Sequence, residues 1–273
     1  MREKQITIAG SALVKGRGLH KGRESTVVFS AAAPGRGIII KNNNEKYTLR
    51  PENVFDTRRG TSVKKGKSRI YTVEHMVSAV RGLGIDNITV EIKGGELPCG
   101  DGSAAVFAKA VLSAGLKKQN ALKKTLEIKE PAAVKDNGCF LAVIPYPVFK
   151  VYYFSDFSEM GCGPMEFSSE VTPDTYLKRI CRARTFGFKK ELQGLIKSGL
   201  IKGAGPKNAV LMDKGRAVNT RLRYKNELAR HKALDVIGDF GILGSGLKML
   251  VIAYKTGHRH NIEAIKKIRT IKK

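Results

Sequence analysis

Three ionisable residues recur at every fourth position in residues 229–239 (ARHKALDVIGD), namely His231, Asp235 and Asp239. On an α-helix, residues four apart share one face, with Cβ atoms about 5–6 Å apart, which suits two ligands of one metal ion. The residues between them are largely apolar, so a stripe of acids and imidazole is unusual for that face. The same pattern also fits a polar stripe that forms ion pairs with Arg230 and Lys232.

Two other histidines stand in positions that suit chemistry. His75 follows Glu74 near the start of a predicted helix, where neighbouring residues diverge by about 100°. The imidazole can therefore ligate a metal while the carboxylate reaches a bound water, although the pair also fits an ordinary first helical turn. It is not the H-E-x-x-H motif of metalloproteases, because Ala79 stands at the position of the second histidine. His258 follows an apolar strand, where it fits either acid–base catalysis or a surface loop.

Together these residues predict a hydrolase of amides or esters. Two histidines and one aspartate would leave the fourth position of a zinc ion open, which is typical of catalytic zinc sites. Zinc lowers the pKa of bound water towards about 7, and Glu74 could take the proton of that water. His258 would be a separate acid, held by a carboxylate such as Asp239.

The composition limits the partners and the compartment. The 273 residues include 50 Lys plus Arg against 24 Asp plus Glu, a formal net charge of +26, which attracts anions. Nucleic-acid binding is not favoured, because there is no Trp, the aromatic share is 7%, and few basic stretches are interleaved with aromatics. The four cysteines have no C-x-x-C spacing, and neither a signal sequence nor a membrane span is evident. These features predict a cytoplasmic protein.

The elements that must position these residues repeat along the chain. A helix, a glycine-rich break, a strand and a second helix are predicted in residues 72–114 and again in residues 227–268. His75 and His231 fall near the same point of the repeated helices. Chance alternation of helices and strands would give a similar internal repeat. If the repeat is real, the fold is α+β, with two similar two-layer α/β sandwich domains and the active site between them.

Two further segments belong to the predicted fold, a link between the domains and an additional helix. Residues 117–124 are basic and polar without periodicity, so we expect a link between domains spanning residues 1–120 and 121–273. A further helix is expected over residues 175–184.

Seven short stretches, in family order across nearly the whole chain, resemble the UDP-3-O-acyl-N-acetylglucosamine deacetylases, the zinc amidases of lipid A biosynthesis. They are GLH at 18–20, TVEH at 72–75, GLGIDN at 82–87, DGSA at 101–104, RARTFGF at 182–188, HKxxDxxxD at 231–239 and KxGH at 255–258. Several independent motifs in register are more specific than any one of them. The resemblance implies two α+β domains with the active site at their interface, in agreement with the internal repeat.

The resemblance also implies roles for individual residues. The implied zinc ligands are His75, His231 and Asp235. Glu74 is the expected general base, and His258, oriented by Asp239, is the expected acid or the electrostatic partner of the oxyanion. Thr185 would help to polarise the amide carbonyl, Phe186 and Lys232 would contact the substrate, and His20 would lie near the nucleotide. The implied reaction removes the acetyl group from the 2-amino position of a UDP-linked acylated glucosamine, releasing acetate.

An insert at about residues 187–215 corresponds to the apolar passage that the family provides for the fatty acyl chain. Leu195, Ile201 and Gly203 are expected to contact the substrate there, although the same stretch also fits a small packed βαβ unit. Ile201 stands where the family often has a cysteine, so the preferred acyl length is not predicted. The family pattern does not explain the charge of +26, which fits either a general basic bias of the proteome or weak peripheral contact with an anionic membrane. We expect a monomer.

Two alternatives remain open at this point. One is a zinc amidase with the same site that acts on another N-acyl sugar. The other, from a different class, is a basic nucleic-acid-binding protein, which would contain no stoichiometric zinc.

Overall fold

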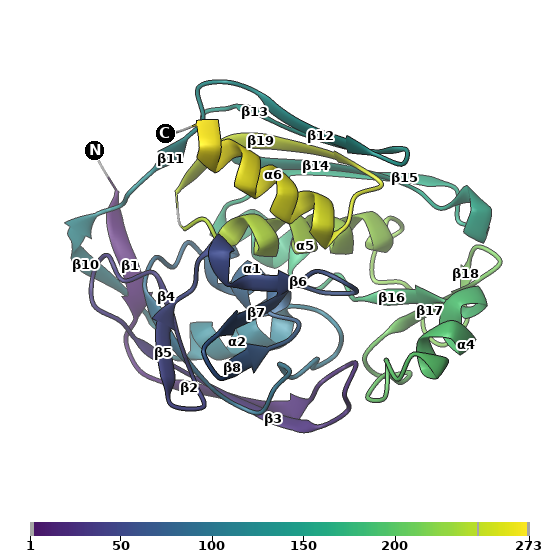
Figure 1. The fold of residues 1–273 in the computed structure, drawn as a ribbon, viewed down its shortest axis with the longest axis horizontal. Coiled ribbons are helices and arrows are strands. Elements are labelled where there is room, and N and C mark those ends of the chain that lie inside the picture. The colour runs from purple at the N-terminus through teal and green to yellow at the C-terminus, as the bar shows by residue number, and fades with distance from the viewer. Residues whose placement is uncertain (1–2, 245, 272–273) are drawn as a thin grey trace.

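The computed structural model describes residues 3–244 and 246–271. Two sheets lie on the outside of the molecule and helices lie between them, as Figure 1 shows. The first sheet has the order β2-β3-β9-β4-β5. Its strands are β2 (Ala12–Arg17), β3 (Glu24–Ala31), β4 (Ile38–Asn42), β5 (Glu45–Thr48) and β9 (Ile88–Lys93). The helices of this half are α1 (Glu74–Gly82) and α2 (Ala105–Ser113).

The second sheet has the order β12-β13-β19-β14-β15, with β11 paired beside β19. Its strands are β11 (Leu126–Glu127), β12 (Ala132–Asp136), β13 (Cys139–Pro145), β14 (Phe149–Asp156), β15 (Pro164–Glu170) and β19 (Leu247–Tyr254). The helices of this half are α5 (Glu227–Gly241) and α6 (His258–Ile271). A short 3₁₀ turn, Ser158–Met160, joins β14 to β15.

The two halves share one pairing pattern. In each sheet the central strand, β9 or β19, runs antiparallel to one neighbour (β3 or β13) and parallel to the other (β4 or β14). In each half that central strand also follows one helix and precedes another. The predicted α+β fold of two similar sandwiches is therefore confirmed.

Two segments have a different secondary structure from the one expected. The stretch at 117–124 is largely strand β10 (Leu116–Leu122), which pairs with β1 (Lys4–Ile8). Its side chains are mostly exposed, so no hydrophobic alternation marks it in the sequence. The division at residue 120 falls inside β10 and stays a prediction.

The helix expected over residues 175–184 is also much shorter than predicted. The structure has one turn, α3 (Pro173–Thr175), followed by a single π-helical turn, Tyr176–Ile180. The ring of Tyr176 is fully buried against Gly82, where a Cβ would lie 2.3 Å from it, and its hydroxyl lies 3.0 Å from Ser78 Oγ. These contacts with α1 accompany the wider turn, which sequence periodicity does not encode.

Each half carries a small inserted sheet before its first long helix. In the first half, the 3₁₀ turn Pro51–Asn53 leads into β6 (Val54–Asp56), β7 (Ser62–Lys65) and β8 (Ser68–Ile70). In the second half, the insert contains β16 (Phe186–Phe188), α4 (Lys189–Lys197), β17 (Val210–Asp213) and β18 (Arg216–Ala217). Strands β16 and β17 are parallel, so β16, α4 and β17 form the βαβ unit that was the alternative to an acyl passage.

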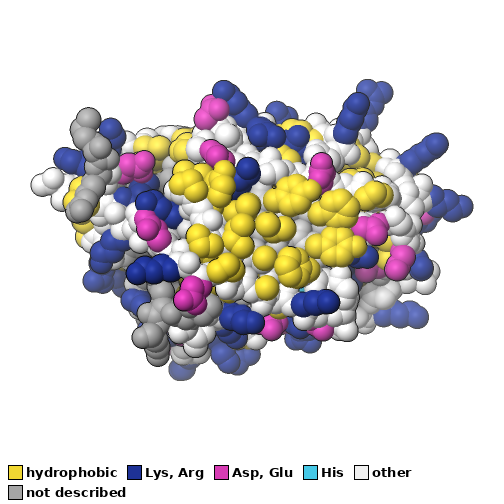
Figure 2. Space-filling model, turned by 90° about the horizontal axis from the view of Figure 1, so that it is seen from above, with side chains coloured by type: hydrophobic (Ala, Val, Ile, Leu, Met, Phe, Trp, Pro, Cys, Tyr) yellow, Lys and Arg dark blue, Asp and Glu magenta, His cyan; other side chains and the backbone are white. Residues whose placement is uncertain are grey.

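The outer face of the second sheet is largely apolar (Figure 2). Along β13, β14 and β19 every second side chain is buried beneath the sheet, and the intervening ones face solvent. The outward-facing apolar residues are Phe140, Ala142, Ile144, Tyr152, Phe154, Leu250, Ile252 and Tyr254. None of the helices in the described part of the chain has the length and hydropathy needed to cross a membrane.

Helices α1 and α5 cross in close contact at the centre of the molecule. Gly238 of α5 lies against the backbone of Glu74, and a Cβ at this glycine would lie only 2.2 Å from the Glu74 carbonyl oxygen. Real Cβ atoms do not approach backbone oxygen so closely, so only glycine allows the helices to meet at this distance.

We predict that Gly238→Ala destabilises the protein by about 1–3 kcal/mol, because the added methyl group must push α5 away from α1. The free energy of unfolding, measured by urea titration, checks this. Gly194→Ala is a matched control, because Gly194 also lies in a helix but a Cβ there has nothing within 4 Å. The control should be neutral or stabilising by up to about 1 kcal/mol. Equal loss in both variants would contradict the crossing argument.

Candidate metal centre and active site

Helices α1 and α5 bring together His75, His231 and Asp235, which we call the metal-ligand group. The Nε2 atoms of His75 and His231 lie 3.6 and 3.5 Å from Asp235 Oδ1, and the three ligand atoms are all within 4.8 Å of one another. All three side chains are buried. The two distances to Asp235 are too long for good hydrogen bonds, but they suit three ligands that each lie about 2 Å from one ion.

The hydrogen bonding of Asp235 fits a metal ligand. Its Oδ2 atom accepts a hydrogen bond from Lys232 Nζ at 2.8 Å, whereas its buried Oδ1 atom has no hydrogen-bond partner among the described residues. A buried carboxylate oxygen without a partner is costly, and a cation between the two imidazoles would satisfy it. Burial alone would raise the pKa of Asp235, but His231 and Lys232 hold that pKa well below its usual range. The group therefore offers the charged ligand that a divalent cation needs.

The imidazole of His231 is oriented by the backbone. Its Nδ1 atom lies 3.2 Å from the carbonyl oxygen of Ala183, so Nδ1 carries the proton and the Nε2 lone pair faces Asp235. Burial lowers the pKa of His231 to about 3, which keeps the ring neutral. A neutral imidazole with a fixed tautomer is the form that binds metal. The His75 ring meets the His231 ring edge to face, with centroids 5.1 Å apart.

Glu74 lies beside the metal-ligand group, in the first turn of α1. Its Oε2 atom accepts a hydrogen bond from the backbone N–H of Thr61 at 2.9 Å. The side chain is 3% exposed, and burial raises the pKa of the carboxyl group, an effect that the nearby imidazoles of His258 and His75 oppose. A carboxylate with a raised pKa accepts a proton more readily than one in water.

His258 is the first residue of α6, and its ring lies between Asp239 and Asp235. Its Nδ1 atom is 2.9 Å from Asp239 Oδ2, and its Nε2 atom is 3.9 Å from Asp235 Oδ2. Burial would lower the pKa of His258, but the charge and hydrogen bond of Asp239, together with Glu74 and Asp235, raise it to about 9. The structure thus contains two buried histidines of opposite character, with His231 neutral and His258 positively charged at neutral pH.

Lys232 and Phe186 lie near this group, and Thr185 directly precedes Phe186 in the chain. Lys232 Nζ lies 5.7 Å from the centroid of the Phe186 ring, and that ring packs 5.9 Å from the His231 ring. The ion pair between Lys232 and Asp235 is one that the polar-stripe alternative anticipated, and it coexists with the metal geometry. Arg230 instead stacks 4.3 Å from the Tyr224 ring. Thr185 is half-buried, and its backbone N–H donates to Gly102 O at 2.7 Å.

A second set of candidates meets at the edge of the inserted unit. The backbone N–H groups of Lys202 and Gly203 donate to the carbonyl oxygens of His20 and Leu19, both at 3.0 Å. A Cβ at Gly203 would lie 2.1 Å from the Gly18 carbonyl oxygen, so glycine is required for this contact. Ile201 has a φ of +54°, an unusual conformation for a β-branched residue. The described contacts join His20, Ile201 and Gly203 but do not connect them to the metal-ligand group.

The other acyl-passage candidate, Leu195, is half-buried on α4. Helix α4 is joined to the loop before β7 by an ion pair in which Arg59 lies 3.2 Å from Glu191. That loop also touches His20, whose Nε2 atom is 3.2 Å from the Arg59 carbonyl oxygen.

Sequence reasoning missed three groups that hold the site together. Thr61 and Asn261 both donate hydrogen bonds to Asp239, and the Ala183 carbonyl accepts from His231. Asn261 stands three residues after His258, a helical spacing that could have marked it. No pattern marks Thr61, because it lies in an irregular loop.

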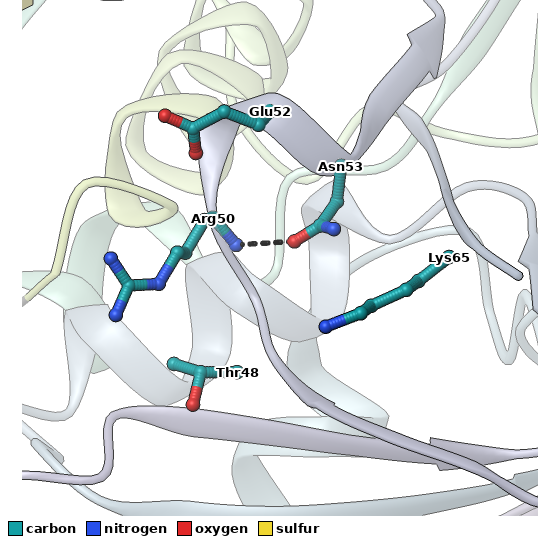
Figure 3. Close-up of a pocket in the computed structure, with 5 residues that line it drawn as sticks. All are labelled: Thr48, Arg50, Glu52, Asn53 and Lys65. Carbon is teal, nitrogen blue, oxygen red and sulfur yellow. Dashed lines mark hydrogen bonds between the residues drawn. The ribbon is translucent and has the colours of Figure 1, made fainter.

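The surface pockets lie elsewhere. Figure 3 shows one of about 400 Å³, lined by Thr48, Arg50, Glu52, Asn53 and Lys65. A second, of about 350 Å³, shares Thr48 and Arg50 with it and extends to Arg81 and Arg269. Neither pocket contains a residue of the metal-ligand group, whereas that group has the unpaired carboxylate oxygen of Asp235 and the neutral imidazole of His231.

Comparison with known proteins agrees with this geometry. The chain is 38% identical to the UDP-3-O-acyl-N-acetylglucosamine deacetylase of Teredinibacter turnerae over 272 residues, covering 97% of this chain and 90% of that relative. It is 35% identical to the protein of the same name from Syntrophus aciditrophicus over 267 residues, covering 96% of this chain and 85% of that relative. The family model described as UDP-3-O-acyl N-acetylglycosamine deacetylase matches residues 5–270. The chain therefore belongs to the UDP-3-O-acyl N-acetylglycosamine deacetylase family.

Proposed function

We propose that this protein is a zinc-dependent deacetylase that removes the N-acetyl group from a UDP-linked, 3-O-acylated N-acetylglucosamine, an early step of lipid A biosynthesis. The products are the free amine and acetate. The observation that carries this proposal is the buried metal-ligand group with its unpaired Asp235 oxygen, in a chain of this deacetylase family.

His75, His231 and Asp235 would hold the zinc ion. Two imidazoles and one carboxylate are a typical ligand set of catalytic zinc. When bound, zinc supplies Lewis-acid polarisation of the carbonyl and lowers the pKa of water towards about 7. The two domains, proposed as residues 1–120 and 121–273, would each contribute ligands, so the site depends on how they pack.

Glu74 acts as the general base in this proposal. It accepts a proton from the water that attacks the acetamide carbonyl. Its raised pKa supports the assignment, since a base works best when its pKa is close to the working pH. The Thr61 N–H fixes the Oε2 atom of Glu74, so the carboxylate is held in one orientation.

In this proposal His258 acts as the acid, on the side of the carbonyl carbon opposite to Glu74. Its positive charge, maintained by Asp239, stabilises the developing oxyanion, and its Nε2–H is available to the departing amine nitrogen. Thr185 is assigned a hydrogen bond to the carbonyl oxygen. Lys232 and Phe186 are assigned contacts with the substrate, His20 the nucleotide, and Leu195, Ile201 and Gly203 the acyl portion.

An acetate-release assay on the UDP-linked substrate tests the function. We predict that Glu74→Gln lowers kcat by about 10²–10⁴-fold, because the amide cannot accept a proton, while metal content stays unchanged. Glu91→Gln is the control, since Glu91 is a partly exposed carboxylate on β9 that pairs with Lys41 and lies outside the metal-ligand group. Turnover by Glu74→Gln at the wild-type rate would show that the base is another residue.

The same assay decides between substrates. Equal activity on the sugar that lacks the 3-O-acyl chain would favour an amidase for other N-acyl sugars. Absence of acetate release together with absence of zinc would favour a binding protein.

Metal analysis of the purified protein tests the ligands. We predict about one zinc ion per chain, and loss of most of it in His231→Ala, because two remaining ligands bind weakly. His260→Ala is a control, because His260 is also buried but belongs to α6 outside the metal-ligand group. Full zinc occupancy in His231→Ala would mean that another residue supplies the ligand.

We propose that the protein works as a cytoplasmic monomer with weak contact to anionic membranes. The apolar outer face of the second sheet, which includes Leu250 and Ile252, supports the membrane contact, as do Lys135 and Lys150 on the same sheet and the net charge of +26. Each lysine near an anionic surface adds about 1 kcal/mol of attraction.

Co-sedimentation with vesicles of anionic phospholipid checks this contact. We predict binding at low salt, release at high salt, and weaker binding by a Leu250→Thr/Ile252→Thr double variant. The control is Leu13→Thr, which alters a leucine that is 52% exposed on β2 of the other sheet. No sedimentation at low salt would rule out membrane contact.

A further inference from the structure

Thr61 touches both proposed proton-transfer residues. It precedes β7 in the first inserted sheet and is completely buried. Its backbone N–H donates to Glu74 Oε2 at 2.9 Å. Its hydroxyl oxygen lies 2.5 Å from Asp239 Oδ1 and 3.2 Å from His258 Nδ1. One residue therefore contacts the proposed base, the proposed acid and the carboxylate that orients the acid.

The donor and acceptor roles at this hydroxyl are fixed by its neighbours. An ionised carboxylate only accepts, so the Thr61 O–H donates to Asp239. The His258 Nδ1–H points to Asp239 Oδ2 at 2.9 Å, so the Thr61 oxygen at 3.2 Å can only share that proton as an acceptor. This arrangement keeps the proton on Nδ1 and directs Nε2 towards Asp235.

The two carboxylate oxygens of Asp239 have different hydrogen-bond donors, and Thr61 serves the Oδ1 atom. Its Oδ2 atom is bound by both His258 and Asn261 Nδ2, the latter at 2.8 Å. Among the described residues, the Thr61 hydroxyl is the one donor recorded at Oδ1. Since Asp239 is fully buried, water cannot readily replace that donor.

The backbone of Thr61 also fixes the start of α1. The Val73 N–H donates to the Thr61 carbonyl oxygen at 3.0 Å, immediately before Glu74. Thr61 thus makes hydrogen bonds to α1 through its backbone and to α5 through its side chain. A residue bonded in this way sets the separation between Glu74 on one side and the His258–Asp239 pair on the other.

We propose that Thr61 is a positioning residue of the deacetylation reaction, which holds the Asp239–His258 pair at a fixed place opposite Glu74 through its hydroxyl group. This inference rests on the proposed function. Among the described residues, the hydrogen bonds of Thr61 go to Glu74, Asp239, His258 and Val73 and not to His75, His231 or Asp235, so its hydroxyl should affect turnover without affecting metal content.

Thr61→Val tests the hydroxyl, because valine keeps the shape and the backbone N–H but cannot donate to Asp239. We expect kcat to fall by about 10–100-fold, the usual effect of removing such a supporting hydrogen bond, with KM and zinc content near wild type. Thr61→Ser retains the hydroxyl and should restore most of the turnover. Equal turnover by Thr61→Val and wild type, or an equal loss in Thr61→Ser, would overturn the proposal.

A double-variant comparison separates positioning from a general loss of structure. In a His258→Ala background, Thr61→Val should have little further effect on kcat, because the group that it positions is gone. A full additional loss in that background would overturn the proposal. If Thr61→Val does not fold, Thr61→Ala is compared with Thr61→Ser in the same two backgrounds and judged by the same outcomes. Wild-type enzyme is assayed in parallel, so failure of the deacetylase function itself appears as absence of acetate release from wild type.

Discussion

The close crossing of α1 and α5 is the constraint on which the rest of the site depends. Gly238 lets the backbone of Glu74 approach α5 at a distance that any side chain would prevent. This approach brings His75 within 3.6 Å of Asp235, although the two helices come from different halves of the chain. A displacement of either helix by a few ångströms would separate the ligands. The metal-ligand group is therefore a property of the packing of two halves and of neither half alone.

The two central histidines have opposite properties because their buried neighbours differ. His231 faces a backbone carbonyl, and desolvation lowers its pKa to about 3. His258 faces the Asp239 carboxylate, whose charge outweighs desolvation and raises the pKa to about 9. The same type of side chain is thus neutral in one place, as the proposed metal ligand must be, and cationic in the other, as the proposed acid must be. The proposed mechanism requires this difference, because a protonated ligand cannot bind metal and a neutral imidazole stabilises an oxyanion poorly.

The repeated halves provide the scaffold and the metal-ligand group, and the inserts add residues around that group. Both sheets have the same strand order and pairing directions. The two small inserted sheets occupy equivalent places, each before the long helix that carries metal ligands. Thr61 lies in the first insert, and Phe186 opens the second. Residues of the inserts therefore complete a site whose ligands come from the duplicated helices.

The sequence by itself determined the local arrangement of the site. The four-residue spacing of His231, Asp235 and Asp239 predicted one helical face, and the repeated helix–strand–helix pattern predicted two similar sandwiches, because apolar periodicity reports burial directly. The tertiary structure alone decided which atoms meet. Periodicity carries no information on contacts between distant segments, so it could not show the approach of His75 to Asp235, the hydrogen bonds of Thr61, or the pairing that makes β10 a strand. Periodicity also does not predict the π turn at Tyr176, whose ring packs against Gly82 of another helix.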